Sequence, residues 1–214
     1  RDPPIPYSSV PMVDDGMHGD GAAGDGRYGA VVAGLADQQQ LDFFIEATDA
    51  AGASVAPAGH ATADEYGQPS QTFLCAFSNE VLPTDFPVYH ILVTLLHKHR
   101  QEALTGYPTR KHPYDATFID GAGNVWYNVI ERYRGQSSLS RFPSSYRIEF
   151  PRNRKLNASL GFPVQTLQLN GQRPSSQWLA YDLFNRAGMP APRAAWAHVR
   201  YSGINYDTCC NGQN

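Results

Sequence analysis

A β-hairpin is predicted by Thr117-Phe-Ile-Asp-Gly-Ala-Gly-Asn-Val-Trp-Tyr-Asn-Val-Ile-Glu-Arg-Tyr-Arg-Gly135. β-Branched and aromatic residues at both ends are typical of strands, and Asp120-Gly-Ala-Gly-Asn124 between them is typical of a turn. A further strand is predicted by Ser145-Tyr-Arg-Ile-Glu-Phe150. Together these strands predict an antiparallel sheet.

The second strand of the hairpin alternates between two faces, because successive side chains of a strand point to opposite sides. One face takes Val125, Tyr127, Val129, Glu131 and Tyr133, and the other takes Trp126, Asn128, Ile130, Arg132 and Arg134. This pattern allows an arginine near the end of the strand to point inward.

The small, polar loop after this strand is a predicted anion site. Hydroxyls, backbone N–H groups and guanidinium groups all bind anions. The candidate residues are Arg134, Gly135, Ser137, Ser138 and Arg147. The alternative interpretation of the same charges is a solvated basic surface.

The rest of this half of the chain predicts strands and one helix. Strands are predicted over 87–96, 166–170 and 194–201. Residues 175–188 predict the main helix, because apolar positions recur with a helical period and Gly188 precedes Pro190. Ser175 or Ser176 is the expected N-cap.

Residues 5–57 favour short strands separated by glycine-rich turns, with strands expected over 27–32 and 41–48. The spacing resembles immunoglobulin-like or fibronectin-like β-modules. The predicted organisation is a partial β-module over 1–58, a linker over 59–79 and a second unit over 80–214. The predicted fold class is α+β, with a β-rich front module followed by an antiparallel sheet and one main helix.

The glycine-rich segment 13–26 carries four aspartates in twelve residues. Glycine lets the backbone bend, so several carboxylates can converge on Ca²⁺, which takes six to eight oxygen ligands. The candidate metal ligands are Asp14, Asp15, Asp20 and Asp25. The spacing does not match an EF-hand, and Asp-Gly pairs also form ordinary turns, so a plain turn structure stays open.

Charge is divided unevenly along the 214 residues. Residues 1–97 carry 13 acidic and 2 basic side chains (−11), residues 98–155 carry 5 and 11 (+6), and residues 156–214 carry 2 and 4 (+2). This division suggests two units with different tasks. The overall net charge of −3 and the lack of a recognised module argue against nucleic-acid binding.

The longest apolar run, 91–96, is too short for a membrane helix, which needs about 20 residues.

Five segments in this order resemble the spore-coat protein H family, the CotH kinases. They are Arg134-Gly-Gln-Ser-Ser138, Ser145-Tyr-Arg-Ile-Glu-Phe150, Leu167-Gln-Leu-Asn170, Ala180-Tyr-Asp-Leu-Phe184 and Gly188-Met-Pro-Ala-Pro192. The resemblance covers about residues 80–203. Because the chain starts at Arg1 and leaves the pattern after Gly203, we interpret it as a fragment holding the first lobe of such a kinase.

The resemblance implies a kinase-like lobe that handles ATP and Mg²⁺ and phosphorylates surface or coat proteins outside the cell or at its surface. The chemistry requires a loop over the phosphates and a cation held by an acid on the helix. This chain departs from the family, with Ser144 where a lysine is usual and Gln177 where the helix acid is usual. Arg147 and Lys155 are the candidate replacement cations. The chain is therefore expected to be inactive by itself, and the alternative is a non-catalytic structural or adhesion protein built on the same scaffold.

Overall fold

The computed structural model of this chain describes residues 7–37, 39–61, 71–78, 84–103, 111–135, 144–157, 162–202 and 204–205. The described part is rich in β-structure and contains two α-helices, which confirms the α+β composition. In chain order the elements are β1 (Gln40–Phe43), β2 (Ile45–Asp49), β3 (Gly52–Ala56), the 3₁₀ turn η1 (Ala58–Ala61), β4 (Phe73–Ala76), β5 (Val88–Leu92), α1 (Leu95–Ala103), β6 (Tyr114–Ile119), β7 (Val125–Arg134), β8 (Ser145–Glu149), β9 (Leu156–Asn157), β10 (Pro163–Val164), β11 (Thr166–Leu169), α2 (Pro174–Arg186), β12 (His198–Tyr201) and β13 (Ile204–Asn205).

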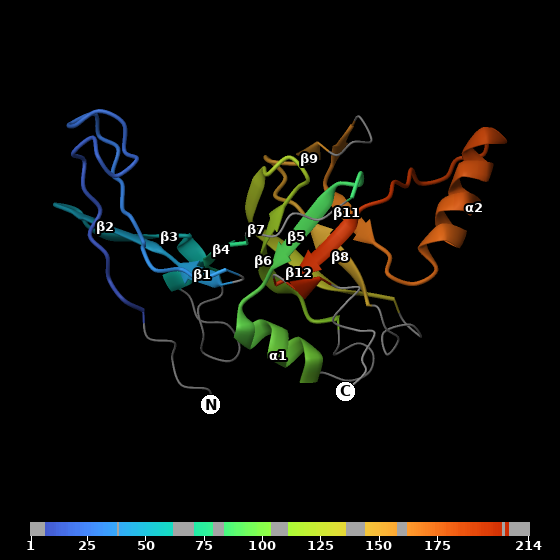
Figure 1. Ribbon diagram of the computed structural model, residues 1–214, viewed down its shortest axis with the longest axis horizontal. Helices are drawn as coiled ribbons and strands as arrows, with labels where there is room; N and C mark the ends of the chain where they lie inside the picture. Colours follow the sequence, from blue (N-terminus) through green and yellow to red (C-terminus); the bar gives the residue numbers. More distant parts are fainter. Residues whose placement is uncertain are drawn as a thin grey trace.

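A curled sheet forms the centre of the molecule, with the strand order β11-β8-β7-β6-β5-β12-β13 (Figure 1). The sheet is mixed, because β12 runs parallel to β5 while the other neighbours are antiparallel. The expectation of a wholly antiparallel sheet was wrong. A parallel pair needs a long crossover, and here the chain between β5 and β12 supplies it.

The predicted hairpin is confirmed as β6 and β7, and β8 continues it. Asp120 shapes the turn, because its Oδ1 accepts hydrogen bonds from the N–H groups of Ala122 and Asn124. The Gly123 N–H donates to the Asp120 carbonyl at 3.0 Å. This local turn chemistry explains why the hairpin could be predicted from the sequence.

A bulge in β7 changes which side chains face the core. Asn128 has a φ of 54°, and the β6–β7 register shifts between Ala116 and Phe118. Trp126 is therefore buried on the same face as Val129, in contrast to the strict alternation expected from the sequence. An extra residue in one strand reverses the alternation on one side of the bulge.

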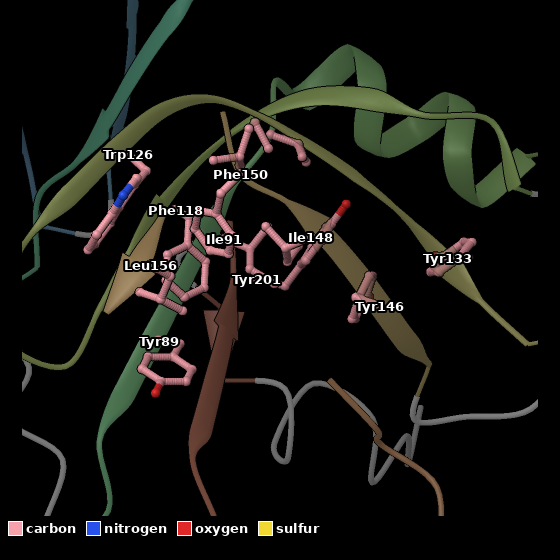
Figure 2. Packing of buried hydrophobic residues seen from close by; sticks show 13 residues of the cluster. Tyr89, Ile91, Phe118, Trp126, Tyr133, Tyr146, Ile148, Phe150, Leu156 and Tyr201 are labelled. Atoms are coloured by element: carbon pink, nitrogen blue, oxygen red, sulfur yellow. The ribbon is translucent and has the colours of Figure 1, made fainter. Parts of the chain in front are cut away.

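The core lies on one face of the curled sheet and consists largely of aromatic side chains (Figure 2). Phe118 is fully buried and packs edge-to-face against Phe150, with ring centroids 5.1 Å apart. Tyr146 stacks on Tyr201 at 4.8 Å. Burial of a large apolar side chain stabilises the fold by about 1.5–3 kcal/mol, so this cluster is the main source of stability.

The front of the chain forms two separate two-stranded ribbons, β1–β4 and β2–β3. The strand expected over 27–32 is absent; the structure has only an isolated bridge between Val13 and Gly29. The strand expected over 41–48 is split between β1 and β2. β4 lies within the predicted linker and packs on the central sheet, where the Leu74 N–H donates to Thr117 Oγ1 at 3.3 Å.

The two helices differ from expectation. The strand predicted over 87–96 ends at Leu92, and α1 follows it. α2 is present, but its N-cap is Arg173, with a φ of 49° and no capping side chain, so neither Ser175 nor Ser176 caps it. No residue of α2 is buried, and Figure 1 shows the helix projecting beyond the sheet instead of lying on it. None of the described helices is long and apolar enough to cross a membrane.

Candidate anion-binding site on the β7–β8 hairpin

Three arginines share the outer face of the β7–β8 hairpin near the end where the chain passes from β7 to β8. Arg132 lies directly opposite Arg147, and Arg134 lies opposite Ser145. Their neighbours in the strands, including Tyr133, point to the aromatic core on the other face. The arginine side of the sheet is therefore the partly exposed side.

One carboxylate lies among these arginines. Glu149 Oε1 is 2.8 Å from Arg147 Nε and 3.7 Å from Arg132 Nη2. The contact between Arg147 Nε and Glu149 Oε1 is an ion pair, but its angles are not those of a hydrogen bond. Three arginines and one glutamate leave a net charge of +2, and like charges opposite each other in a sheet are unfavourable unless a counter-ion separates them. This arrangement favours a bound anion.

The structure brings together part of the predicted site. Arg134, Gly135 and Arg147 lie at one end of the hairpin, with Gly135 at a φ of 118°. Ser137 and Ser138 lie outside the described residues. The idea of an inward arginine was wrong, because the inward positions near the strand end belong to Glu131 and Tyr133. Arg132 was missed as a site residue, although the strand alternation places it beside Arg134.

A polar network connects this hairpin to the start of α2. Ser145 Oγ donates to Asn170 Oδ1 at 3.0 Å and accepts from the Gly171 N–H at 3.2 Å. Asn170 in turn donates to Gln177, and Gln177 donates to the hydroxyl of Tyr181. The network fixes the first turns of α2 relative to the sheet edge, while the rest of the helix extends outward.

The aspartate segment near the front folds on itself. Asp20 accepts hydrogen bonds from the N–H groups of residues 15, 16 and 18, and Asp14 accepts from those of residues 24 and 26. Asp25 accepts from Ala22 and Arg27. Among the described residues no three His, Cys, Asp or Glu side chains gather in a group that could hold a metal. The four predicted ligands are therefore used in turns, and calcium binding stays a prediction.

Asp15 and His18 form an ion pair at the tip of this segment. His18 Nδ1 lies 2.9 Å from Asp15 Oδ1. The hydrogen bond and the charge of Asp15 raise the pKa of His18, and the same hydrogen bond lowers the pKa of Asp15. Hydrogen bonds from backbone N–H groups, that of Gly16 first, lower the pKa of Asp20. These carboxylates consequently stay charged at neutral pH.

A second polar group, missed from the sequence, lies buried between α1, β7 and β12. Gln101 Nε2 donates to Glu131 Oε2 at 2.9 Å, and the Tyr201 hydroxyl donates to Gln101 Oε1 at 2.6 Å. Glu131 is fully buried, and this burial raises its pKa to about 8. The acid is therefore mainly protonated at neutral pH. Because the Glu131 side chain is fully buried, we interpret its role as structural.

A third buried group attaches the front ribbon to the sheet. Asn128 Nδ2 lies 3.2 Å from both oxygens of Asp115 and 3.3 Å from the carbonyl oxygen of Thr72. The Thr72 N–H also donates to Asp115 Oδ2 at 3.3 Å. Burial raises the pKa of Asp115 to about 7, and these hydrogen bonds oppose the shift. The bulge residue Asn128 thus holds a buried acid.

Comparison with protein-family models and with curated proteins finds no match for this chain.

Proposed function

We propose that this chain binds phosphate groups on the outer face of the β7–β8 hairpin, as the sheet-bearing lobe of a CotH-like phosphotransferase. The observation that supports it is the placement of Arg132, Arg134 and Arg147 on one face with Glu149 as their only described counter-charge. Guanidinium groups match the planar geometry of phosphate oxygens and bind them in a bidentate manner. The target implied by the resemblance is a surface or coat protein outside the cell or at its surface.

The arginine set fits the phosphates of ATP, whose negative charges need several cations. Lys155, the other replacement cation considered, is exposed in a loop. α2 brings no acid to Arg147: Asp182 is instead 2.7 Å from Arg186 on the same helix. The cation–acid pair of a kinase lobe is thus not formed by these residues. The proposal therefore concerns phosphate binding, and it assigns no step of transfer and no Mg²⁺ ligand to these residues.

Calorimetric titration tests this proposal with three probes: tripolyphosphate, ATP and adenosine. We expect tripolyphosphate and ATP to bind with similar affinity, weakening with added salt, and adenosine not to bind. Arg147→Ala should weaken ATP binding at least about tenfold, because a hydrogen bond to a charged group contributes about 1.5–3 kcal/mol and each 1.4 kcal/mol changes the affinity tenfold. Glu149→Gln should strengthen it, because the competing carboxylate is removed.

Matched controls separate this site from a general charge effect. Arg27→Ala removes the same charge in the front segment and should leave ATP affinity unchanged. Arg147→Lys keeps the charge but loses the planar fork, so it should recover only part of the affinity. Equal losses in Arg27→Ala and Arg147→Ala, or no binding of tripolyphosphate at low salt, would contradict the proposal.

A second candidate function is a non-catalytic structural or adhesion protein on the same scaffold. The observation that favours it is the exposure of three large apolar side chains of α2, Leu179, Leu183 and Phe184. An exposed apolar patch on a folded domain marks an interaction surface.

A further inference from the structure

α2 presents an apolar surface that no described residue covers. Leu179 and Leu183 are one helical turn apart and are 50% and 55% exposed. Another side of the helix carries Trp178, whose ring lies 6.2 Å from that of Trp196. A helix of 13 residues depends on burial of its apolar side for stability, so this surface favours a partner.

The surroundings of this surface are basic. Arg173, Arg186 and Arg193 lie in or beside α2, and Asp182 is the only acid between residues 170 and 197. The local net charge is therefore +2. Asp182 is already paired with Arg186. A partner for this surface should combine exposed apolar side chains with carboxylates.

The front segment 13–32, here called the head loop, has this complementary chemistry. It exposes Met17 (83%), Tyr28 (62%) and Val31 (62%). It also carries four aspartates and one arginine, a net charge of −3. Hydrogen bonds between Val13 and Gly29 close the loop.

The head loop is organised before it meets any partner. The aspartates hold its backbone through their N–H hydrogen bonds, as described above. A Cβ atom at Gly29 would lie 2.2 Å from the His18 carbonyl oxygen, so the two arms of the loop approach as closely as glycine allows. A preformed loop loses little conformational entropy on binding, which favours association.

The head loop and α2 lie at opposite ends of the long axis of the molecule (Figure 1). One copy therefore cannot bring its own head loop onto its own α2. We propose that copies of this chain associate head to tail, with the head loop of one copy docked on the Leu179–Leu183 side of α2 in the next. Such a contact joins two different surfaces and therefore extends into rings or filaments. The proposal does not depend on phosphate binding at the hairpin.

Sedimentation velocity over a concentration series tests the association of the intact chain. A small, charged interface is expected to have a Kd of about 10–100 µM, so we expect the mean mass to rise beyond a dimer as the protein approaches about 0.5 mM. Added salt should reduce the mass, because exposed charges are screened. A monomer throughout this range at low salt would overturn the proposal.

Two single variants and their mixture test the head-to-tail geometry. Leu183→Asp damages the tail, and Met17→Arg damages the head; both change exposed side chains, and circular dichroism checks that each variant is folded. Each variant alone should self-associate at least about a hundredfold more weakly, so that it stays largely monomeric up to about 0.5 mM. An equimolar mixture should form a dimer and stop there, because only one intact head and one intact tail can meet.

Leu95→Asp is the matched control, since Leu95 is an exposed leucine (66%) at the start of α1, outside both surfaces. It should associate like the unaltered chain. Association that survives in Met17→Arg but not in Leu183→Asp would instead indicate that α2 pairs with a second α2, and this would overturn the head-to-tail arrangement. Loss of association in Leu95→Asp would show a nonspecific effect and would overturn it as well.

Discussion

Glu131→Gln is expected to stabilise the fold at neutral and alkaline pH. The carboxyl of Glu131 is fully buried, and burial raises its pKa from the ordinary 4.5 to about 8. Between these two pH values the unfolded chain is ionised at this position while the folded chain stays neutral. Stability therefore falls as pH rises through this window, by about 1.4 kcal/mol per pH unit at most. Glutamine does not titrate, so the gain at pH 8 should be on the order of 4 kcal/mol.

The geometry around Glu131 is consistent with a neutral acid. The Tyr201 hydroxyl donates a hydrogen bond to Gln101 Oε1 at 2.6 Å and lies 3.4 Å from Glu131 Oε2. A protonated Glu131 can donate toward that hydroxyl oxygen, whereas an ionised one accepts a hydrogen bond from the Gln101 amide at 2.9 Å. Glutamine at position 131 offers an N–H in place of the acid proton, so the same network can form.

Urea unfolding of both proteins from pH 5 to pH 9 checks this prediction. The difference in unfolding free energy between Glu131→Gln and the unaltered chain should grow with pH and level off above about pH 8. Using the difference removes the contribution of Asp115, whose pKa is also raised, to about 7. Two parallel pH curves would show that Glu131 does not titrate in this window.

Tyr201→Phe is the companion variant. It removes one hydroxyl and leaves the buried Gln101 Oε1 without its donor, so a loss of about 1–3 kcal/mol should already be present at pH 5, where Glu131 is neutral in the folded chain. The contrast between a gain that develops only as pH rises and a loss already present at pH 5 separates ionisation from hydrogen bonding.

Local sequence patterns predicted the central β6–β7 hairpin better than they predicted which side chains of a strand are buried or how distant strands pair. The turn at Asp120 depends on hydrogen bonds within five residues, so the hairpin was predictable. α1 was missed although a signal existed: Thr94 Oγ1 accepts a hydrogen bond from the His97 N–H, as an N-cap does. The apolar run before it, which is typical of a buried strand, outweighed that cap.

Long-range contacts account for what the sequence did not predict. The parallel pairing of β12 with β5 joins residues more than 100 positions apart, and no local pattern determines it. The same holds for α2: its period correctly indicated a helix, but a period does not specify which surface the helix meets. At the candidate site, Arg134 and Arg147 were identified because strand ends can be located, whereas Glu149 became relevant only through the observed pairing.

The position of Trp126 shows how one residue changes an assignment. Strict alternation placed Trp126 opposite Val129, but the bulge at Asn128 buries both on the same face. Asn tolerates a positive φ better than most residues. Its presence therefore allows a bulge at this position but does not by itself predict one. The same residue also holds Asp115, which makes it a sensitive point for mutation.

Asn128→Asp is expected to destabilise the fold by about 3–5 kcal/mol, the range for an unpaired buried charge. The amide nitrogen of Asn128 donates to both oxygens of Asp115 at 3.2 Å and to the carbonyl oxygen of Thr72 at 3.3 Å. A carboxylate in its place presents an acceptor to three acceptors and adds a second negative charge beside a buried acid. Backbone strain does not explain this loss, because Asp, like Asn, tolerates a positive φ.

Two further substitutions at this position separate strain from hydrogen bonding. Asn128→Gly removes the amide but accepts the φ of 54° freely, and Asn128→Ala removes the amide and adds strain of about 1 kcal/mol. The expected order of destabilisation is therefore Gly, then Ala, then Asp. Lowering the pH should restore more stability in the Asp variant than in the Gly and Ala variants, because protonation removes the charge repulsion with Asp115.

Urea unfolding measures this order, and hydrogen exchange at Thr72 and Leu74 shows where the structure opens. The N–H groups of these residues donate to Asp115 and Thr117 and attach the β1–β4 ribbon to the sheet. In Asn128→Asp their exchange should accelerate more than that of the β7–β8 amides, because the ribbon loses its anchor before the aromatic core opens. Equal stability of the Asp and Ala variants would mean that Asp115 does not respond to a neighbouring carboxylate, and this would contradict the prediction.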